Sequence, residues 1–506
     1  MKLRFNFKSV FIEVVSLLFI LLFVYAAITK LLDFENFQVQ LGQSPLLSAY
    51  ASWVSWLVPI IELVIATALI IPKCRTAALI ASLGMMTMFS VYIIIILNYS
   101  SFVPCSCGGI LEKMNWKEHL VFNLFFVLLA VITIMIMPVK KEFNAENRIF
   151  NFEKKHKYIS LLSSIFLAVG IMFLLFIKSE STMKFDNSFI RRFAGGTEKI
   201  YEKNLYYNSF YFAGAVEGKI YLGNRSAPLI ATELDTALVI VKYHTIKVND
   251  TAISKSAQLR INQSGFYLID GSISSVFRGK MLDWKAKIIR REKLRFTQPQ
   301  VVDSLNISFR TIDQSTDQSE LGSLFLGYHA RVSIQSDLLQ KQVDGMFDVD
   351  GKLYYDYYSK RHVYIYTYRN EFIVSDSKLN LIYRSNTIDT VRMAKIKVAF
   401  IKSRGVKKLA APPLVVNKYG AVCHNLLFIN SNITGRYEDR KMWNQAAVID
   451  VYNLKNKSYI SSFYVYNIKD EKLKSFYVKN DIFYALIGTH LTAYRLGKII
   501  KNQYNN

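Results

Sequence analysis

Five apolar runs, each about the length of a membrane-spanning helix, fill the first 177 residues and constrain the fold more than any other feature. About 20 residues of helix cross the hydrocarbon core of a bilayer. The runs are residues 10–32, 47–71, 76–98, 118–137 and 158–177. The first follows MKLRFNFK, which resembles the start of a signal peptide, but it lacks a convincing cleavage site and precedes four more spans. We therefore expect a retained first helix in a multi-pass α-helical membrane bundle.

The distribution of lysine and arginine among the short connections predicts the orientation of this bundle. Basic residues gather at the N-terminus and in the connections after the second and fourth runs: Lys2, Arg4, Lys8, Lys73, Arg75, Lys140, Lys141, Arg148, Lys154, Lys155 and Lys157. These parts should be cytoplasmic, including a basic loop at residues 138–157. Five spans then place everything after residue 177 outside, which is the periplasm for a protein of the inner membrane.

The charge of the chain is concentrated in its second part. The formal net charge is +25, of which +5 belongs to residues 1–177 and +20 to the remainder. A basic domain can indicate nucleic-acid binding. Here the chain is tethered to a membrane, and its basic residues alternate with tyrosine and serine. We expect no nucleic acid as partner, and instead a solvated basic surface that faces anionic membrane lipid or polyanionic envelope polymers.

From about residue 183 the sequence changes to short aromatic and β-branched runs separated by Gly, Asn, Asp and Ser, a pattern typical of strands joined by turns. Examples are residues 218–224, 265–271, 351–377 and 481–496. A propeller blade takes roughly 40–50 residues, so residues 183–500 predict an all-β domain that is a six- or seven-bladed β-propeller. A large two-sheet β domain is the alternative.

The outer domain contains no recognisable catalytic motif. Four of its histidines, which we interpret as surface or packing residues, are scattered along the sequence: His329, His362, His424 and His490. Cys423 stands alone, which is typical of a buried small hydrophobic residue. The Asn-x-Ser/Thr sequons matter only in a eukaryotic secretory pathway, and they carry little weight here.

The stretch VPCSCGGILEKMNWKEHL, residues 103–120, holds two of the four cysteines on the predicted outer side. Cα atoms two residues apart in an extended chain lie near the roughly 7 Å limit for a relaxed disulfide. Cys105 and Cys107 can therefore pair only in a sharp turn, which Pro104 and the following glycines favour. A strained disulfide in a small ring is easily reduced, so the pattern favours thiol exchange over structural cross-linking. We predict that both cysteines are catalytic.

The residues after this pair predict a helix that begins near Trp116. Asn115 is a candidate N-cap and Glu118 its capping-box partner. The positive end of the helix would then face the cysteines and favour thiolate. His119 and Asn123 are four residues apart and share a face. His119 is a candidate proton carrier for exchange or for a bound quinone, and a polar interface or packing residue is the alternative.

Glu62, near the middle of the second run, is a candidate functional residue because an ionisable group is expensive at that depth. It could be protonated, pair with Lys30, or relay protons. Pro59, one turn earlier, should free a carbonyl group of the helix. Lys30 and Asp33 end the first helix at the outer face, where they could also serve as interfacial anchors. Cys74 should be a free thiol, since topology places it on the cytoplasmic side.

Taken in order, ITKLLDFENF, VPIIEL, VPCSCGG and the W-x-x-H-x-x-x-N helix resemble the MauE (methylamine utilisation) branch of the DoxX-like membrane proteins, over residues of about 8–137. The resemblance implies a four-helix, redox-associated membrane bundle at residues 1–137 that helps to form disulfides beside a thioredoxin-like periplasmic partner. The fifth helix, residues 158–177, and the β domain depart from the simple form of the family.

By analogy with membrane disulfide-generating enzymes, the resemblance also implies electron transfer from Cys105 and Cys107 to a quinone, with Glu62, Lys30 and Asn123 as candidate binding residues. We expect a thiol–disulfide oxidoreductase whose propeller docks the partner or substrate. The chain lacks a second outward-facing cysteine pair, so transfer would have to be direct. A non-catalytic, membrane-anchored propeller that binds an envelope component is the alternative. We expect no metal site, because two thiolates and His119 leave zinc one ligand short unless water or Glu112 completes it.

Overall fold

The computed structural model describes residues 7–43, 47, 50–99, 114–137, 154–182, 189–193, 197–248, 254, 256–291, 294–328 and 331–504. These residues form two compact units. The first unit contains residues 1–184 together with a later segment, Ile396–Pro413. The second unit contains residues 185–395 and 414–506.

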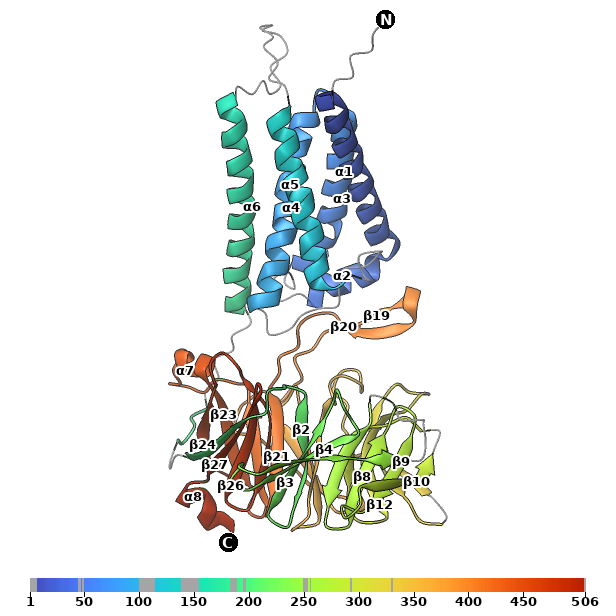
Figure 1. Cartoon of the computed structure of the whole chain (residues 1–506), viewed down its shortest axis with the longest axis vertical. Coiled ribbons are helices and arrows are strands. Elements are labelled where there is room, and N and C mark those ends of the chain that lie inside the picture. The colour runs from blue at the N-terminus through green and yellow to red at the C-terminus, as the bar shows by residue number, and fades with distance from the viewer. Residues whose placement is uncertain are drawn as a thin grey trace, which may run out of the picture. The chain divides into compact units, whose positions relative to one another are not determined.

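The first unit contains five helices that are long and apolar enough to cross a membrane, among the residues that the structure describes. They are α1 (Phe7–Leu32), α3 (Ala51–Ile70), α4 (Arg75–Tyr99), α5 (Trp116–Ile136) and α6 (Lys154–Thr182). Figure 1 shows them side by side, with successive long helices running in opposite directions. The five-helix prediction is therefore confirmed.

A short helix that the sequence analysis did not predict, α2 (Phe34–Gln43), follows α1 directly. Phe37 and Leu41 are four residues apart and both are buried, so they form the apolar face by which α2 packs on the bundle. Rings of Phe34 and Trp56 lie 4.3 Å apart between their centroids, which joins the start of α2 to α3.

Aromatic and small residues pack the bundle. Phe19 and Phe23 of α1 are fully buried, and the Phe19 ring makes an edge contact with Phe126 of α5. The fifth long helix, α6, contacts α4, where the Ser164 hydroxyl donates a hydrogen bond of 3.2 Å to the Ile80 carbonyl. A Cβ on Gly84 would lie 2.9 Å from the Ser164 Oγ. Small residues at such contacts let membrane helices approach closely.

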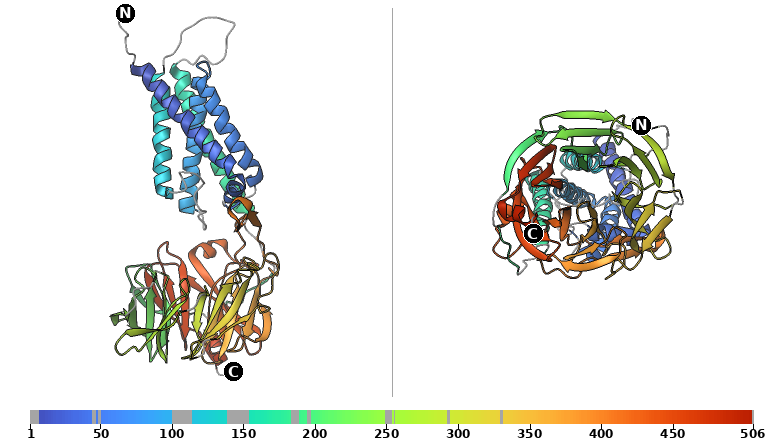
Figure 2. Two further views of the ribbon diagram at one scale, coloured as in Figure 1. Left: turned by 90° about the vertical axis from the view of Figure 1, so that its right-hand side faces the viewer. Right: turned by 90° about the horizontal axis from the view of Figure 1, so that it is seen from below.

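The second unit is a propeller of six blades, which confirms the all-β prediction (Figures 1 and 2). The first blade contains β2 (Phe210–Val216), β3 (Lys219–Asn224), β4 (Ile230–Asp235) and β5 (Val241–Thr245). The second contains β7 (Gln258–Asn262), β8 (Gly265–Asp270), β9 (Ser275–Gly279) and β10 (Lys285–Arg291), with β6 (Lys247–Val248) added to β10. The third contains β11 (Thr297–Val301), β12 (Asn306–Ile312), β13 (Ser319–Phe325) and β14 (Arg331–Gln335).

The remaining three blades complete the ring. The fourth blade contains β15 (Gly351–Asp356), β16 (Arg361–Tyr366), β17 (Glu371–Ser375) and β18 (Leu381–Asn386). The fifth contains β21 (Asn417–Cys423), β22 (Leu426–Ser431), β23 (Ala446–Asn453) and β24 (Ser458–Tyr466). The sixth contains β25 (Leu473–Lys479), β26 (Ile482–Ile487) and β27 (His490–Arg495) together with β1 (Glu198–Asn204). All four strand-rich segments named from the sequence are strands in the structure.

The sixth blade closes the propeller by combining both ends of the domain. β1, the first strand of the unit, pairs antiparallel with β27, the last. This pairing makes β1 the end strand of the last blade and joins the first and last strands of the domain in one sheet. Radial closure of this kind protects strand edges that would otherwise pair with other chains.

Hydrogen bonds between neighbouring blades reinforce the ring near its axis. One side chain on the innermost strand of each of the first four blades bonds to the backbone of the next blade's innermost strand. The pairs are Leu259 N to Tyr211 OH (2.7 Å), Arg260 Nε to Pro299 O (3.1 Å), Gln298 Nε2 to Gly351 O (2.7 Å) and Gly420 N to Tyr354 OH (2.7 Å). Burial raises the pKa of Tyr354 well above its ordinary value, so its hydroxyl stays protonated.

Several short elements lie outside the blades. A two-stranded hairpin, β19 (Val398–Ile401) and β20 (Val406–Leu409), lies in sequence between the fourth and fifth blades but belongs to the first compact unit. The helices α7 (Arg440–Gln445) and α8 (Lys498–Lys501) belong to the second.

Candidate functional site

An ion pair between Lys30 and Glu62 forms the centre of the candidate site. The Lys30 Nζ, in the last turn of α1, donates to the Glu62 Oε1 near the middle of α3. The Glu62 side chain has no exposed surface, and that of Lys30 is 14% exposed. A carboxylate at this depth needs a close partner, because an isolated buried charge costs several kcal/mol or more. Of the three states predicted for Glu62, the structure has the pairing with Lys30.

Two aromatic rings from other helices complete the surroundings of the Lys30 ammonium group. The Phe37 ring of α2 lies 5.8 Å from Lys30 Nζ, and the Phe89 ring of α4 lies 5.6 Å from it. Both distances fall within the range of cation–π attraction. The sequence analysis named neither ring as a site residue. The amphipathic spacing of Phe37 and Leu41 was the signal that could have revealed α2.

His119 and Asn123 lie on α5, one turn apart, and the second of them is buried. α5 packs against α1, the helix that carries Lys30, where the Phe126 ring contacts the Phe19 ring. Three buried polar atoms of the site have no hydrogen-bond partner among the described residues: Glu62 Oε2, His119 Nδ1 and Asn123 Nδ2. Buried polar atoms are usually paired, so these three residues are candidates for binding a polar ligand.

Pro59 adds a further polar feature to α3. It lies inside the helix and is buried three residues before Glu62. Because proline has no backbone N–H, the carbonyl group of Ser55, one turn earlier, has no helical donor at that position. Ser55 is also fully buried. The prediction of a freed carbonyl group near Glu62 therefore agrees with the observed helix.

The predicted start of α5 is confirmed in detail. Asn115 is the N-cap, its side-chain oxygen accepts from the Glu118 N–H at 2.9 Å, and the Glu118 Oε2 accepts from the Asn115 N–H at 2.9 Å. This reciprocal capping box satisfies two N–H groups at the helix start. Cys105 and Cys107 lie outside the described residues, so their pairing stays a prediction.

The two described cysteines do not form a pair. Cys74 lies at the turn before α4 and Cys423 on β21, and both are free. Burial raises the pKa of Cys423 to about 11, and its Sγ lies 3.1 Å from His424 Nδ1. A thiol with so high a pKa is a poor nucleophile. Cys423 is therefore a packing residue, as predicted.

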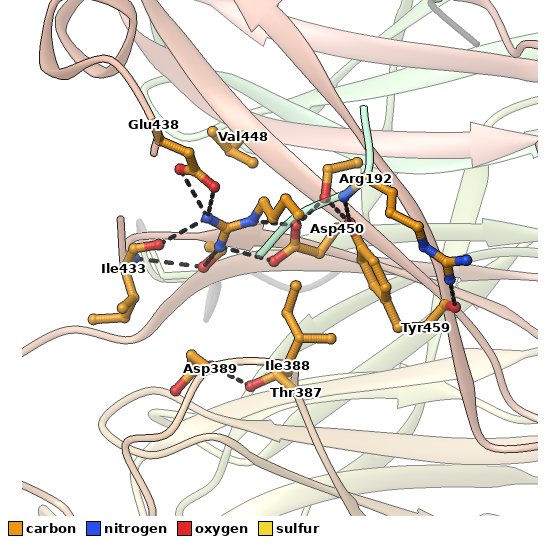
Figure 3. A network of polar contacts seen from close by, with 12 residues as sticks. Arg192, Thr387, Ile388, Asp389, Ile433, Glu438, Val448, Asp450 and Tyr459 are labelled. Atoms are coloured by element: carbon orange, nitrogen blue, oxygen red, sulfur yellow. Dashed lines mark hydrogen bonds and ion pairs between the residues drawn. The ribbon is translucent and has the colours of Figure 1, made fainter. Parts of the chain in front are cut away.

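A buried arginine organises the start of the propeller (Figure 3). The Arg191 guanidinium donates to Asp450 at 2.7 and 3.1 Å, to Glu438 at 2.8 and 3.0 Å, and to the Ser431 hydroxyl at 2.8 Å. Burial opposes its charge, but the two carboxylates raise the pKa of Arg191 above its ordinary value. The Arg191 guanidinium and the side chains that accept from it satisfy one another's hydrogen-bonding groups. We therefore interpret the network as an anchor for the first segment of the propeller.

The described propeller histidines match their predicted structural roles. His362 is buried, with Nδ1 2.8 Å from the Asp376 carbonyl oxygen. The ring centroids of His424 and Tyr358 lie 4.5 Å apart with the rings tilted, and His490 Nδ1 lies 2.7 Å from Glu202 Oε1. His329 lies outside the described residues. No group of three or more His, Cys, Asp or Glu side chains that could hold a metal ion occurs in the part of the chain that the structure describes.

Residues 8–136 match the model of the family described as Methylamine utilisation protein MauE. The segment is a MauE domain, which confirms the resemblance found in the sequence. The match ends before the fifth long helix and the propeller. No curated protein matches the chain.

Several solved structures are similar to parts of the chain at low identity. A member of the DUF4221 family from Bacteroides vulgatus is 12% identical, with a TM-score of 0.38, and the match covers 61% of this chain and 97% of that one. A putative exported protein from Bacteroides fragilis is 8% identical, with a TM-score of 0.38, covering 62% and 99%. A structure of a nidogen/laminin complex is 12% identical, with a TM-score of 0.31, and the match covers 51% of this chain and 81% of that one. Likenesses this distant carry no conclusion about function.

Proposed function

We propose that the membrane unit is a thiol–disulfide oxidoreductase that carries electrons from protein thiols to a quinone. Its Cys105–Cys107 pair would exchange with a thioredoxin-like or disulfide-containing partner on the outer side of the inner membrane. The observation that supports this best is the set of polar groups in the MauE domain: a buried Lys30–Glu62 ion pair and three buried polar atoms without a hydrogen-bond partner among the described residues.

The proposed reaction has two balanced steps. A thiolate of the partner attacks the Cys105–Cys107 disulfide, and the mixed disulfide resolves to give an oxidised partner and two reduced cysteines. The two cysteines then lose two electrons and two protons to the quinone, which becomes a quinol, and their disulfide forms again. No second cysteine pair is required when the quinone accepts electrons directly from the pair.

The chemistry of the unpaired atoms fits both forms of a quinone head group. Asn123 Nδ2 is a hydrogen-bond donor, and His119 Nδ1 donates in one of its tautomers. Both suit the carbonyl oxygens of a quinone. Glu62 Oε2 is an acceptor and suits a quinol hydroxyl. Lys30, already paired with Glu62, adds positive charge where negative charge develops on a reduced quinone.

The placement of these residues along the helices supports contact with the cysteines. Lys30 lies in the last turn of α1, and His119 lies in the first turn of α5. These two helix ends face the same end of the bundle, because successive long helices run in opposite directions (Figure 1). Residues 100–113, which include both cysteines, follow α4 and precede α5 in the sequence. The distribution of basic residues supports an outward orientation for that end of the bundle.

Quinol formation by the full chain in proteoliposomes is the direct test. A reduced dithiol would be added to vesicles that contain a quinone, and quinol would be followed by absorbance. We expect Cys105→Ser and Cys107→Ser to abolish the reaction. Cys74→Ser is the matched control and should leave the rate unchanged, because Cys74 is a free thiol at the turn before α4.

The site residues can be tested separately from the cysteines. His119→Leu and Asn123→Leu should raise the KM for quinone by about tenfold for each lost hydrogen bond, with the partner's thiols still exchanging with Cys105 and Cys107. Wild-type quinol formation in Cys105→Ser and Cys107→Ser would contradict the proposal. If those variants also kept the cellular function of the chain, the alternative of a non-catalytic, membrane-anchored binding propeller would be favoured.

A further inference from the structure

The β19–β20 hairpin belongs to the first unit but contributes no residue to the proposed redox site. It is contributed by Ile396–Pro413, far along the chain from the helices of that unit. Its tip hydrogen-bonds to the junction of α1 and α2: the Lys402 N–H donates to Glu35 Oε2 at 3.0 Å, and the Ser403 hydroxyl donates to Asp33 Oδ1 at 3.2 Å. Figure 1 shows the hairpin beside α2.

These contacts place the tip at the boundary of the hydrocarbon layer. α1 has 26 residues and ends at Leu32, so it is about 39 Å long and exceeds the roughly 30 Å core. Asp33 follows directly. Trp53 and Trp56, at the start of α3, are 80% and 53% exposed. Exposed tryptophans at helix ends mark the interface between membrane and water. The partners of Lys402 and Ser403 therefore lie at the level of the lipid headgroups.

The composition of the hairpin suits this level. Residues 396–413 contain five Lys or Arg and no Asp or Glu. Lys397 and Lys402 are exposed, and the apolar side chains of Phe400 and Val406 are 55% and 40% exposed. Apolar side chains that enter the acyl boundary, combined with cations that meet anionic headgroups, are typical of interfacial elements.

The pairing of the two strands favours a lipid surface over a protein partner. Phe400 lies opposite Lys407, and Ile401 lies opposite Val406. Opposite residues share a face and successive residues alternate, so Phe400 and Val406 project from opposite faces. A protein that docked on one face would leave the other apolar side chain in water. Insertion of the hairpin edge into a lipid layer covers both.

We propose that the β19–β20 hairpin is a lipid-binding element that inserts Phe400 and Val406 at the membrane surface and binds anionic phospholipid headgroups through its lysines. The turn supports this shape, since Gly405 adopts a left-handed φ of 61° that closes the turn tightly. The hairpin then holds the chain between the fourth and fifth blades at the leaflet where α1 ends. This role is independent of electron transfer by the cysteines.

Site-specific photocrosslinking of the full chain tests the proposal. Phe400 is replaced by p-benzoylphenylalanine, and the protein is reconstituted in phosphatidylcholine vesicles with or without phosphatidylglycerol. We expect phospholipid adducts at position 400, with phosphatidylglycerol enriched over its share of the vesicle. The same probe at Tyr206, a propeller side chain that is 79% exposed, is the matched control and should give no such adducts.

Variants that remove a lysine charge distinguish binding of the lipid headgroups from burial of the apolar side chains alone. Lys397→Gln and Lys402→Gln should each lower the phosphatidylglycerol enrichment by about fivefold, and the Lys402 backbone bond to Glu35 should survive because it does not involve the side chain. Equal lipid adducts with and without phosphatidylglycerol would overturn the headgroup part of the proposal. Adducts with protein, either α2 or a separate chain, in place of lipid would overturn it entirely.

Discussion

Lys30 and Glu62 lie 32 residues apart in sequence and form an ion pair inside the helical bundle, between the last turn of α1 and the middle of α3. The pair links α1 to α3 in addition to the apolar contacts between these helices. It also gives the Glu62 carboxyl group a close partner in the middle of a predicted membrane span.

Removal of one partner should destabilise the bundle much more than removal of both. Glu62→Gln or Lys30→Met leaves one buried group without its partner, which costs about 3–5 kcal/mol. The double variant Lys30→Met/Glu62→Leu should recover most of this loss, because no uncompensated charge remains. Unfolding of the purified protein in a denaturing detergent, followed by circular dichroism, would measure the stability of the two single variants and of the double variant. A double variant as unstable as the sum of the single variants would contradict the interpretation.

The N-cap of α5 gives a smaller and more local prediction. Asn115→Ala removes the acceptor for the Glu118 N–H and should cost about 1 kcal/mol, whereas Asn115→Ser should retain most of the cap. Hydrogen exchange of the first turn of α5 is the measurement. We expect faster exchange at the Glu118 amide in the alanine variant, with the amides near Thr133 unchanged. Equal exchange in wild type and both variants would show that the cap does not hold this turn.

The features that could be predicted from the sequence are those coded by neighbouring residues. Apolar runs of about 20 residues revealed the five long helices, and Asn115 with Glu118 revealed a helix start. Alternating aromatic residues and turn residues indicated a propeller. Each of these signals is contained in a short window, where local geometry decides the outcome.

The features that could not be predicted depend on contacts between distant segments. The pairing of β1 with β27, the placement of Ile396–Pro413 beside α2 and the ring of Phe89 near Lys30 all join residues far apart in sequence. Pairing of Glu62 with Lys30 was only one of three options, because depth along a helix does not determine the rotation of its side chains. The number of blades likewise required the observed ring closure.

His362 should make the propeller less stable in acid. Burial lowers the pKa of His362 to about 4, against about 6.5 in an unfolded chain. Between these values the unfolded state binds a proton that the folded state does not. Stability should therefore fall as the pH decreases from about 6.5 to 4, by on the order of 3 kcal/mol in total.

The variant His362→Asn tests this origin of the acid sensitivity. It should be less stable than wild type at pH 7, because a buried contact is lost. Its stability should nevertheless change less between pH 6.5 and 4, because the titrating group is gone. Thermal unfolding of the full chain across this pH range would supply both quantities. An unchanged pH dependence would assign the acid sensitivity to other groups.

Arg191 should be essential for anchoring the start of the propeller. Its guanidinium has no exposed surface and binds Asp450 and Glu438 together. Arg191→Met would leave two buried carboxylates without a cation, at a cost of about 3–5 kcal/mol. Arg191→Lys should not restore stability, since an ammonium group cannot form the paired hydrogen bonds that a planar guanidinium makes.

The neighbouring Arg192 provides the matched control for this experiment. Its side chain is exposed and bonds to the Tyr459 carbonyl at 2.8 Å (Figure 3), so Arg192→Met should cost about 1 kcal/mol or less. Limited proteolysis of the full chain would show which part of the chain loses stability. We expect cleavage before β1 to increase in Arg191→Met and to stay at the wild-type rate in Arg192→Met. Equal effects of the two substitutions would mean that burial between the two carboxylates gives Arg191 no special role.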